Sequence, residues 1–178
     1  MDAKVGNTPE NLVNRLDDYF VDEPEAGRFN VHRDLFRDEQ LFALEMEHVF
    51  EASWVFLGHE SQLPDPHDYL TTHIGRQPVV IMRDEAGELA AFLNLCPHRG
   101  TRLYPQRSGN SPVQMCPYHA WCFDSAGQNV KLKDQDLGCY TEEFLQDDHG
   151  LISIGQFENY QGFLFGALPS AVPTLLDY

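Results

Sequence analysis

The spacing of apolar positions changes once along the chain, at Trp54. Between residues 38 and 54 apolar positions recur at helical intervals, which predicts an amphipathic helix whose apolar face packs on a core. Its apolar positions are Phe42, Met46, Val49 and Phe50. Asp38 suits the start of this helix, because an acidic side chain there faces the unpaired N–H groups of the first turn.

After Trp54 the chain forms a succession of short apolar runs. They are rich in β-branched and aromatic residues and are separated by turn residues, as is typical of strands. The runs are residues 54–60, 69–75, 78–84, 88–96, 112–116, 121–127, 151–156 and 157–168. Gly87 is expected in a hairpin turn, and Gly162 marks a break in the last run. This pattern predicts a mainly β fold, built as an antiparallel sandwich or small barrel.

The two ends of the chain differ from its middle. Residues 1–30 are polar and acidic, and predict an N-terminal arm with a short helix over 9–20 and a linker over 21–29. Residues 31–168 contain the longer helix and the strands, and form the predicted domain. Residues 169–178 contain two prolines and are expected to be a connector.

The net charge narrows the class of partner. The 178 residues include 12 Lys and Arg against 28 Asp and Glu, which gives a formal net charge of −16. Nucleic acid and anionic membrane surfaces both attract basic proteins, so neither is expected as a partner. No apolar run is long enough to span a membrane, and the acidic N-terminus does not resemble a signal peptide. These features predict a cytoplasmic protein.

Four residues in two short segments have the spacing of a metal site. Cys96 and His98 are separated by one residue, and Cys116 and His119 by two. In a reducing compartment such cysteines indicate metal binding or catalysis rather than disulfides. Each segment offers one thiolate and one imidazole, which suits a Rieske [2Fe–2S] cluster with two cysteines on one iron and two histidines on the other. Zinc and four core residues without a metal are the alternatives, although zinc sites usually separate the cysteine pair from the histidine pair.

The neighbouring residues favour two tight loops. Pro97 and Pro117 follow the two cysteines and stiffen the backbone, and Gly100 permits a sharp turn. Cys122 and Cys139 have no partner at ligand spacing and are expected to be plain buried thiols.

Around these motifs the chain resembles the N-terminal Rieske domain of the large (alpha) subunit of aromatic ring-hydroxylating dioxygenases. The likeness rests on NLCPHRG and CPYHAWCFDSAGQ at the loops and on YQGFLFGAL near the C-terminus. It is greatest to the benzoate, toluate and anthranilate group. The resemblance implies a Rieske-type antiparallel β-sheet domain with two cluster-binding loops, preceded by an N-terminal helical segment. The residues expected around the four ligands are Arg99, Gly100, Pro117, Tyr118 and Trp121.

The resemblance also implies partners and a second iron. In this family an NADH-dependent flavin and iron–sulfur reductase supplies electrons, which the Rieske cluster relays to a mononuclear Fe(II). That iron lies in a separate catalytic domain and cis-dihydroxylates an aromatic acid with O2, and the subunits form trimers or alpha–beta hexamers. This chain has no matching iron-binding set outside the two loops, so it is expected to be inactive alone. A stand-alone Rieske ferredoxin is the alternative, but such ferredoxins usually lack a segment like residues 30–54.

Two further expectations concern the surroundings of the cluster. High-potential Rieske proteins have a disulfide between the loops and hydroxyl groups after the last histidine. This chain has Thr101, Tyr118, Trp121 and Phe123 at those places. Fewer hydrogen bonds to the cluster sulfurs predict a negative midpoint potential. Trp121 is expected to pack beside the cluster, as a shield or as ordinary core.

Three arginines concentrate positive charge near the loops of an otherwise acidic chain. They are Arg99, Arg102 and Arg107. Complementary charge mainly raises the rate of encounter, so these residues are candidates for docking the reductase. Local salt bridging and a role in loop structure are the alternative.

Overall fold

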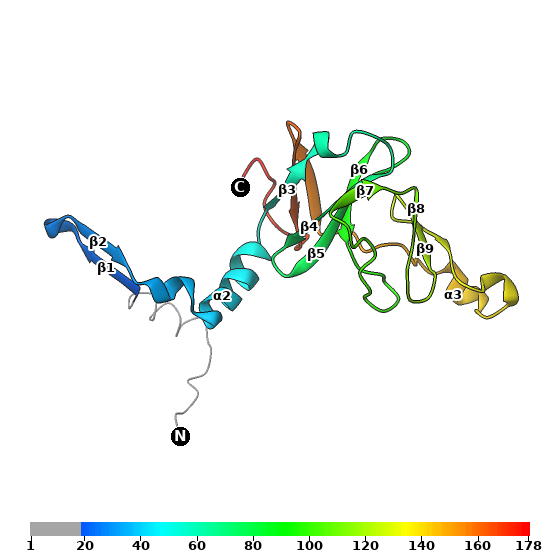
Figure 1. Cartoon of the computed structure of the whole chain (residues 1–178), viewed down its shortest axis with the longest axis horizontal. Helices are drawn as coiled ribbons and strands as arrows, with labels where there is room; N and C mark the ends of the chain where they lie inside the picture. The colour runs from blue at the N-terminus through cyan, green and yellow to red at the C-terminus, as the bar shows by residue number, and fades with distance from the viewer. Residues whose placement is uncertain (1–18) are drawn as a thin grey trace, which may run out of the picture. The chain divides into compact units, whose positions relative to one another are not determined.

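The computed structural model describes residues 19–178 (Figure 1). The chain divides into two units, with the boundary between Glu47 and His48. Most of the helix expected over 9–20 lies outside the described residues. Strands β1 (Phe20–Glu23) and β2 (Arg28–Val31) pair as an antiparallel hairpin through the 3-10 turn η2 (Pro24–Ala26). The expected linker over 21–29 is therefore wrong. Gly27, at φ +61°, allows the chain to reverse there.

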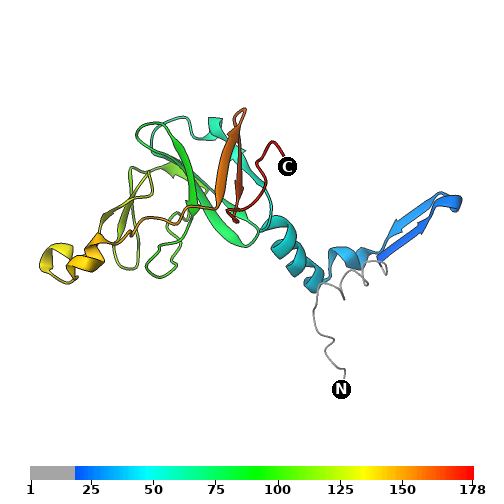
Figure 2. The same ribbon diagram turned by 180° about the vertical axis from the view of Figure 1, so that it is seen from behind.

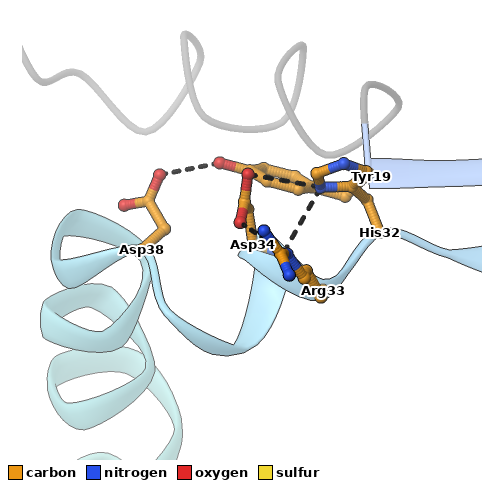
Figure 3. A network of polar contacts seen from close by, with 5 residues as sticks. All are labelled: Tyr19, His32, Arg33, Asp34 and Asp38. Carbon is orange, nitrogen blue, oxygen red and sulfur yellow. Dashed lines mark hydrogen bonds and ion pairs between the residues drawn. The ribbon is translucent and has the colours of Figure 1, made fainter.

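Polar contacts join the hairpin to the segment that follows it. The Tyr19 hydroxyl donates to an Asp38 carboxylate oxygen at 2.7 Å (Figure 3). The other Asp38 oxygen accepts from the Gln40 and Leu41 amides. His32 and Arg33 lie beside Asp34 at the start of the 3-10 turn η3 (Arg33–Phe36). The contacts of His32 and Arg33 with Asp34 are exposed, whereas Asp38 forms the N-cap of helix α2 (Glu39–Glu45).

The helix expected over 38–54 is confirmed over most of its length. Helix α2 continues as the π-turn η4 (Met46–Phe50). Three of its four predicted apolar positions are exposed, however: Phe42, Val49 and Phe50 are 57%, 52% and 42% exposed, whereas Met46 is half-buried. The helical period was a correct guide to local structure, but the expected burial of this face is wrong.

Three antiparallel sheets make up the second unit, which confirms the mainly β fold. The first has the order β6-β5-β4-β7, the second β10-β9-β8 and the third β11-β12-β3. The strands are β3 (Val55–His59), β4 (Asp68–Ile74), β5 (Gln77–Arg83), β6 (Leu89–Leu93), β7 (Ser108–Asn110), β8 (Val113–Met115), β9 (Cys122–Asp124), β10 (Asn129–Lys131), β11 (Gln156–Tyr160) and β12 (Phe163–Ala167). Figures 1 and 2 place β8, β9 and helix α3 (Glu142–Gln146) at one end of this unit and β3 at the other.

Most of the expected strands are present, with one exception. Residues 151–155 form only an isolated bridge, between Ser153 and Phe92, and Gln156 begins β11. The run 157–168 is a hairpin of β11 and β12 that turns at Gly162, with φ +89°. Strands β7 and β10 and helix α3 are short and have no clear apolar period, so the sequence pattern did not indicate them. The remaining short turns are η5 (Glu60–Gln62) and η6 (Gln135–Leu137).

Strand β5 separates two apolar cores. Val79 and Ile81 point into a core formed with β3, β4 and β12, whereas Val80 and Met82 point into a core that contains both Cys96 and Cys116. Successive side chains of a strand face opposite sides of its sheet, so a continuous apolar run fills both. The candidate metal site therefore rests directly on the central sheet.

The C-terminal segment is held against the second unit. The Trp54 indole N–H donates to the Pro173 carbonyl at 2.8 Å, and the Gln156 amide donates to the Ser170 carbonyl at 2.9 Å. Within residues 19–178 no helix is long and apolar enough to cross a membrane.

Candidate metal centre

The first loop follows β6 and closes on itself through two backbone hydrogen bonds. The Cys96 amide donates to the Thr101 carbonyl at 2.8 Å, and the Gly100 amide donates to the Cys96 carbonyl at 2.8 Å. Gly100 has φ +71°, and a side chain added there would meet no other atom within 4 Å. Glycine is therefore favoured at this position by the backbone conformation and not by a lack of space for a side chain.

The second loop joins β8 to β9 and repeats the same two bonds. The Cys116 amide donates to the Trp121 carbonyl at 2.8 Å, and the Ala120 amide donates to the Cys116 carbonyl at 3.0 Å. Ala120 occupies the position of Gly100 and has φ +54°. An L-residue with a side chain is strained in this region. The two loops therefore share a backbone turn, with histidine at the second position after the cysteine in one and at the third in the other.

The two thiols lie together in the core. Cys96 and Cys116 are each 2% exposed, and both belong to the same apolar cluster as Phe123. Burial raises the pKa of the Cys96 thiol, and the neighbouring Cys116 thiol raises it further, whereas the backbone N–H groups of His98 and Arg99 lower it. The free thiol is therefore favoured, and binding of a metal would release its proton. The same N–H groups are available to a thiolate once it forms.

The two imidazoles form a second pair. The ring centroids of His98 and His119 are 4.6 Å apart, with the planes at 76°. His119 Nδ1 is buried and has no hydrogen-bond partner among the described residues. Desolvation, His119 and Arg99 together lower the pKa of His98. A neutral imidazole and an unpaired buried ring nitrogen both suit metal ligation.

The four donors form a pair of thiols and a pair of imidazoles. Within residues 19–178 no group of three or more His, Cys, Asp or Glu side chains is arranged to hold a single metal ion. A pair of thiols and a separate pair of imidazoles fit a cluster of two irons, with a different ligand pair on each, better than a tetrahedral zinc ion. The residues present therefore fit a Rieske-type [2Fe–2S] cluster.

Trp121 covers the imidazole pair from one side. Its ring stacks on His98 with centroids 4.7 Å apart and planes at 14°, and it is 6% exposed. His149 and Phe144 also contact its ring, edge to face, at 5.4 and 6.4 Å between centroids. Trp121 is thus buried in the core and adjacent to a candidate ligand, and a role in shielding a bound cluster stays a prediction.

A groove of about 730 Å³ opens beside these rings. Its wall is supplied largely by the segment between β10 and β11, which the sequence pattern did not connect with the site. These wall residues are Lys133, Asp134, Cys139, Tyr140, Phe144, Asp148 and His149.

Cys139 is exposed, so its expected burial is wrong, whereas Cys122 is half-buried. Both are free thiols.

The arginines near the loops have no acidic partner. Among residues 19–178, no ion pair involves Arg99, Arg102 or Arg107, and all three are exposed. Arg102 instead approaches His73, with 3.2 Å between Nη2 and Nε2. Local salt bridging therefore does not explain this cluster of charge, and a role of these arginines in loop structure stays the alternative. Pro117 and Tyr118 are exposed on the second loop.

Comparison with known proteins agrees with this geometry. Residues 53–141 match the Rieske [2Fe–2S] domain family, and the chain belongs to that family. Membership implies a [2Fe–2S] cluster as the cofactor.

The most informative relatives define the type of Rieske domain. The chain is 44% identical over 163 residues to the toluate 1,2-dioxygenase subunit alpha of Pseudomonas putida, covering 90% of this chain and 36% of that protein. It is 42% identical over 170 residues to the 2-halobenzoate 1,2-dioxygenase large subunit of Burkholderia cepacia, covering 94% and 37%. The structure of naphthalene 1,2-dioxygenase from Rhodococcus sp. bound to indole matches with a TM-score of 0.75 and 27% identity, covering 95% and 36%.

These matches confirm the resemblance to the large subunits of aromatic ring-hydroxylating dioxygenases. The chain is a Rieske domain of that type rather than of the stand-alone ferredoxin type. It spans little more than a third of the length of the relatives that it matches.

Proposed function

We propose that this chain is the electron-relaying part of an aromatic ring-hydroxylating dioxygenase. Cys96 and Cys116 bind one iron of the [2Fe–2S] cluster as thiolates, and His98 and His119 bind the other as neutral imidazoles. The observation that carries this assignment is the pair of matched loops, which bring thiol beside thiol and imidazole beside imidazole. When bound, the cluster stores and releases one electron at a time.

The protein gives the two sides of the site different environments. The buried thiols keep water from one side, while the exposed His98 ring lies at the surface. Trp121 holds the plane of His98 by stacking, and the His98 and Arg99 amides stabilise negative charge at Cys96. Electrons therefore enter and leave through the imidazole side.

The reaction served by this relay follows from the relatives. Their names are those of dioxygenases for 2-halobenzoate and toluate, which are aromatic acids. We infer a mononuclear Fe(II) in a catalytic domain outside this chain, and NADH-dependent cis-dihydroxylation of a benzoate-like acid with O2. The full-length subunit is inferred to form a trimer or an alpha–beta hexamer.

A flavin and iron–sulfur reductase is the inferred electron donor. The unpaired Arg99, Arg102 and Arg107 form a basic area near the exposed His98, in a chain whose formal net charge is −16. Such an area would steer an acidic partner to the electron entry side. The free cysteines agree with a cytoplasmic location.

Metal and sulfide analysis with spectroscopy tests this proposal. The purified chain, reconstituted anaerobically with iron and sulfide, is expected to bind two irons and two sulfides. Its reduced form should give the EPR spectrum of a Rieske centre with a low average g value. The midpoint potential should be negative, towards the low end of the range of about −150 to +300 mV for such centres. Zinc without visible colour would overturn the assignment, and a clearly positive potential would overturn the expectation about hydrogen bonding.

A further inference from the structure

The first cluster loop has no pair of strands at its base, and a buried amide side chain takes their place. Asn94 is 1% exposed. Its Nδ2 donates to the Tyr104 carbonyl at 2.8 Å, and its Oδ1 accepts from the Tyr104 amide at 2.9 Å. Two residues of paired antiparallel strands exchange the same two kinds of bond through their backbones. The Asn94 side chain thus forms the same two kinds of hydrogen bond as a residue of a paired strand, and it closes the loop that contains Cys96.

The base of this loop is attached to the central sheet. The backbone amide of Asn94 donates to the Pro78 carbonyl of β5 at 2.8 Å. Because Asn94 stands two residues before Cys96, its position relative to β5 is passed directly to the ligand. Tyr104, three residues after Thr101, is held at the other leg of the loop.

A second amide links the two loops to each other. Gln114 Nε2 donates to the Leu103 carbonyl at 3.0 Å. Gln114 lies in β8, paired with Phe123 of β9, and stands two residues before Cys116. Asn94 and Gln114 each stand two residues before a cysteine, and the side chains of both therefore bind the backbone of residues 103–104.

We propose that Asn94 and Gln114 are positioning residues that set the separation of the two cluster loops. The inference rests on the proposed binding of a [2Fe–2S] cluster by these loops. Neither amide touches the four candidate ligands through its hydrogen bonds; each acts through the backbone of residues 103–104. Their loss would let the loops shift relative to each other, which changes the geometry offered to the two irons.

The test replaces each amide by a similar-sized apolar side chain. In Asn94→Leu the Tyr104 amide and carbonyl lose their partners, and in Gln114→Leu the Leu103 carbonyl loses one. The reconstituted variants should lose visible cluster absorbance about ten-fold faster than wild type in the presence of a chelator, as expected for one buried hydrogen bond. The g values of the reduced cluster should also shift, with the larger change in Asn94→Leu.

The matched control is Leu164→Ala in the other apolar core, where the side chain is fully buried and remote from both cysteines. It should unfold at lower denaturant concentration but keep the wild-type g values and rate of cluster loss. A merely structural role predicts the same for the two amide variants, and that result would overturn the proposal. If Asn94→Leu does not fold, the half-buried Gln114→Leu decides the outcome alone. A wild-type chain without a [2Fe–2S] cluster would instead refute the proposed function.

Discussion

The two cluster loops have the same backbone turn but obtain it by different means. In the first, Gly100 adopts the left-handed conformation without strain, and the Asn94 side chain closes the base. In the second, Ala120 adopts that conformation, and the paired strands β8 and β9 close the base. Backbone pairing in the second loop therefore supports a strained residue, whereas the first loop combines a permissive residue with a side-chain clamp. Similar ligand geometry does not require similar sources of stability.

Removal of a cysteine ligand should have the same effect in both loops. Cys96→Ala and Cys116→Ala are both expected to abolish the [2Fe–2S] cluster, because each leaves one iron with an incomplete ligand set. Iron analysis and visible absorbance after reconstitution measure the loss. Cys122→Ser is the control, since this free thiol lies outside the ligand spacing, and should bind a normal amount of iron. A full complement of iron in either alanine variant would contradict the assignment.

Charge reversal should affect the first loop alone. The double variant Arg102→Glu and Arg107→Glu is expected to slow reduction by the reductase about ten-fold at low ionic strength, and less at high salt, because steering is screened. Stopped-flow measurement of cluster absorbance gives the rate. Lys131→Glu on β10, beside the second loop, serves as the control with a smaller expected effect. Unchanged kinetics at low salt in the double variant would remove the docking role.

Exchange of the residue in the left-handed position should act in opposite directions on the two loops. Gly100→Ala is expected to lower the free energy of unfolding by about 1 kcal/mol, because φ +71° strains a side chain although space is open. Ala120→Gly should raise it, by less than 1 kcal/mol, since relief of strain is partly offset by the entropy of the unfolded glycine. Denaturant titration of both variants gives the two values. Changes of the same sign in the free energy of unfolding of the two variants would show that the loops differ in more than this residue.

Mutation of the ion pair between Glu51 and Arg76, which lies outside both loops, should give the smallest change in stability. The Arg76 side chain and amide bind the Glu51 carboxylate, with 2.6 Å between Nη2 and Oε2, and lower the pKa of Glu51 from 4.5 to about 2. Because the folded value is the lower one, this stabilisation is complete above pH 4.5 and is lost as the pH falls towards 2. Glu51→Gln should therefore be slightly less stable than wild type at pH 7, and the difference should shrink in acid. Denaturant titrations across this pH range test the trend, and a cluster spectrum altered by the mutation would contradict its independence from the loops.

Local spacing was sufficient for much of the fold and for the candidate ligands. The run 78–84 predicted a strand, and the Cys-x-His and Cys-x-x-His pairs predicted two loops with one thiol and one imidazole each. Such features depend on residues close in sequence, whose backbone geometry places them on one face or in one turn. The resemblance of these motifs to a family added the cofactor and the type of enzyme.

Other features depended on contacts between distant segments. The sequence alone determined that Cys96 and His98, and Cys116 and His119, occupy tight loops, and that most of the chain after Trp54 is β structure. Only the tertiary structure decided that Asn94 pairs with Tyr104, that Trp121 lies on His98, and that the apolar face of α2 and η4 is exposed. The physical reason is that a side chain's partner is selected by the packing of segments far apart in the chain, which a local pattern of polar and apolar residues does not specify.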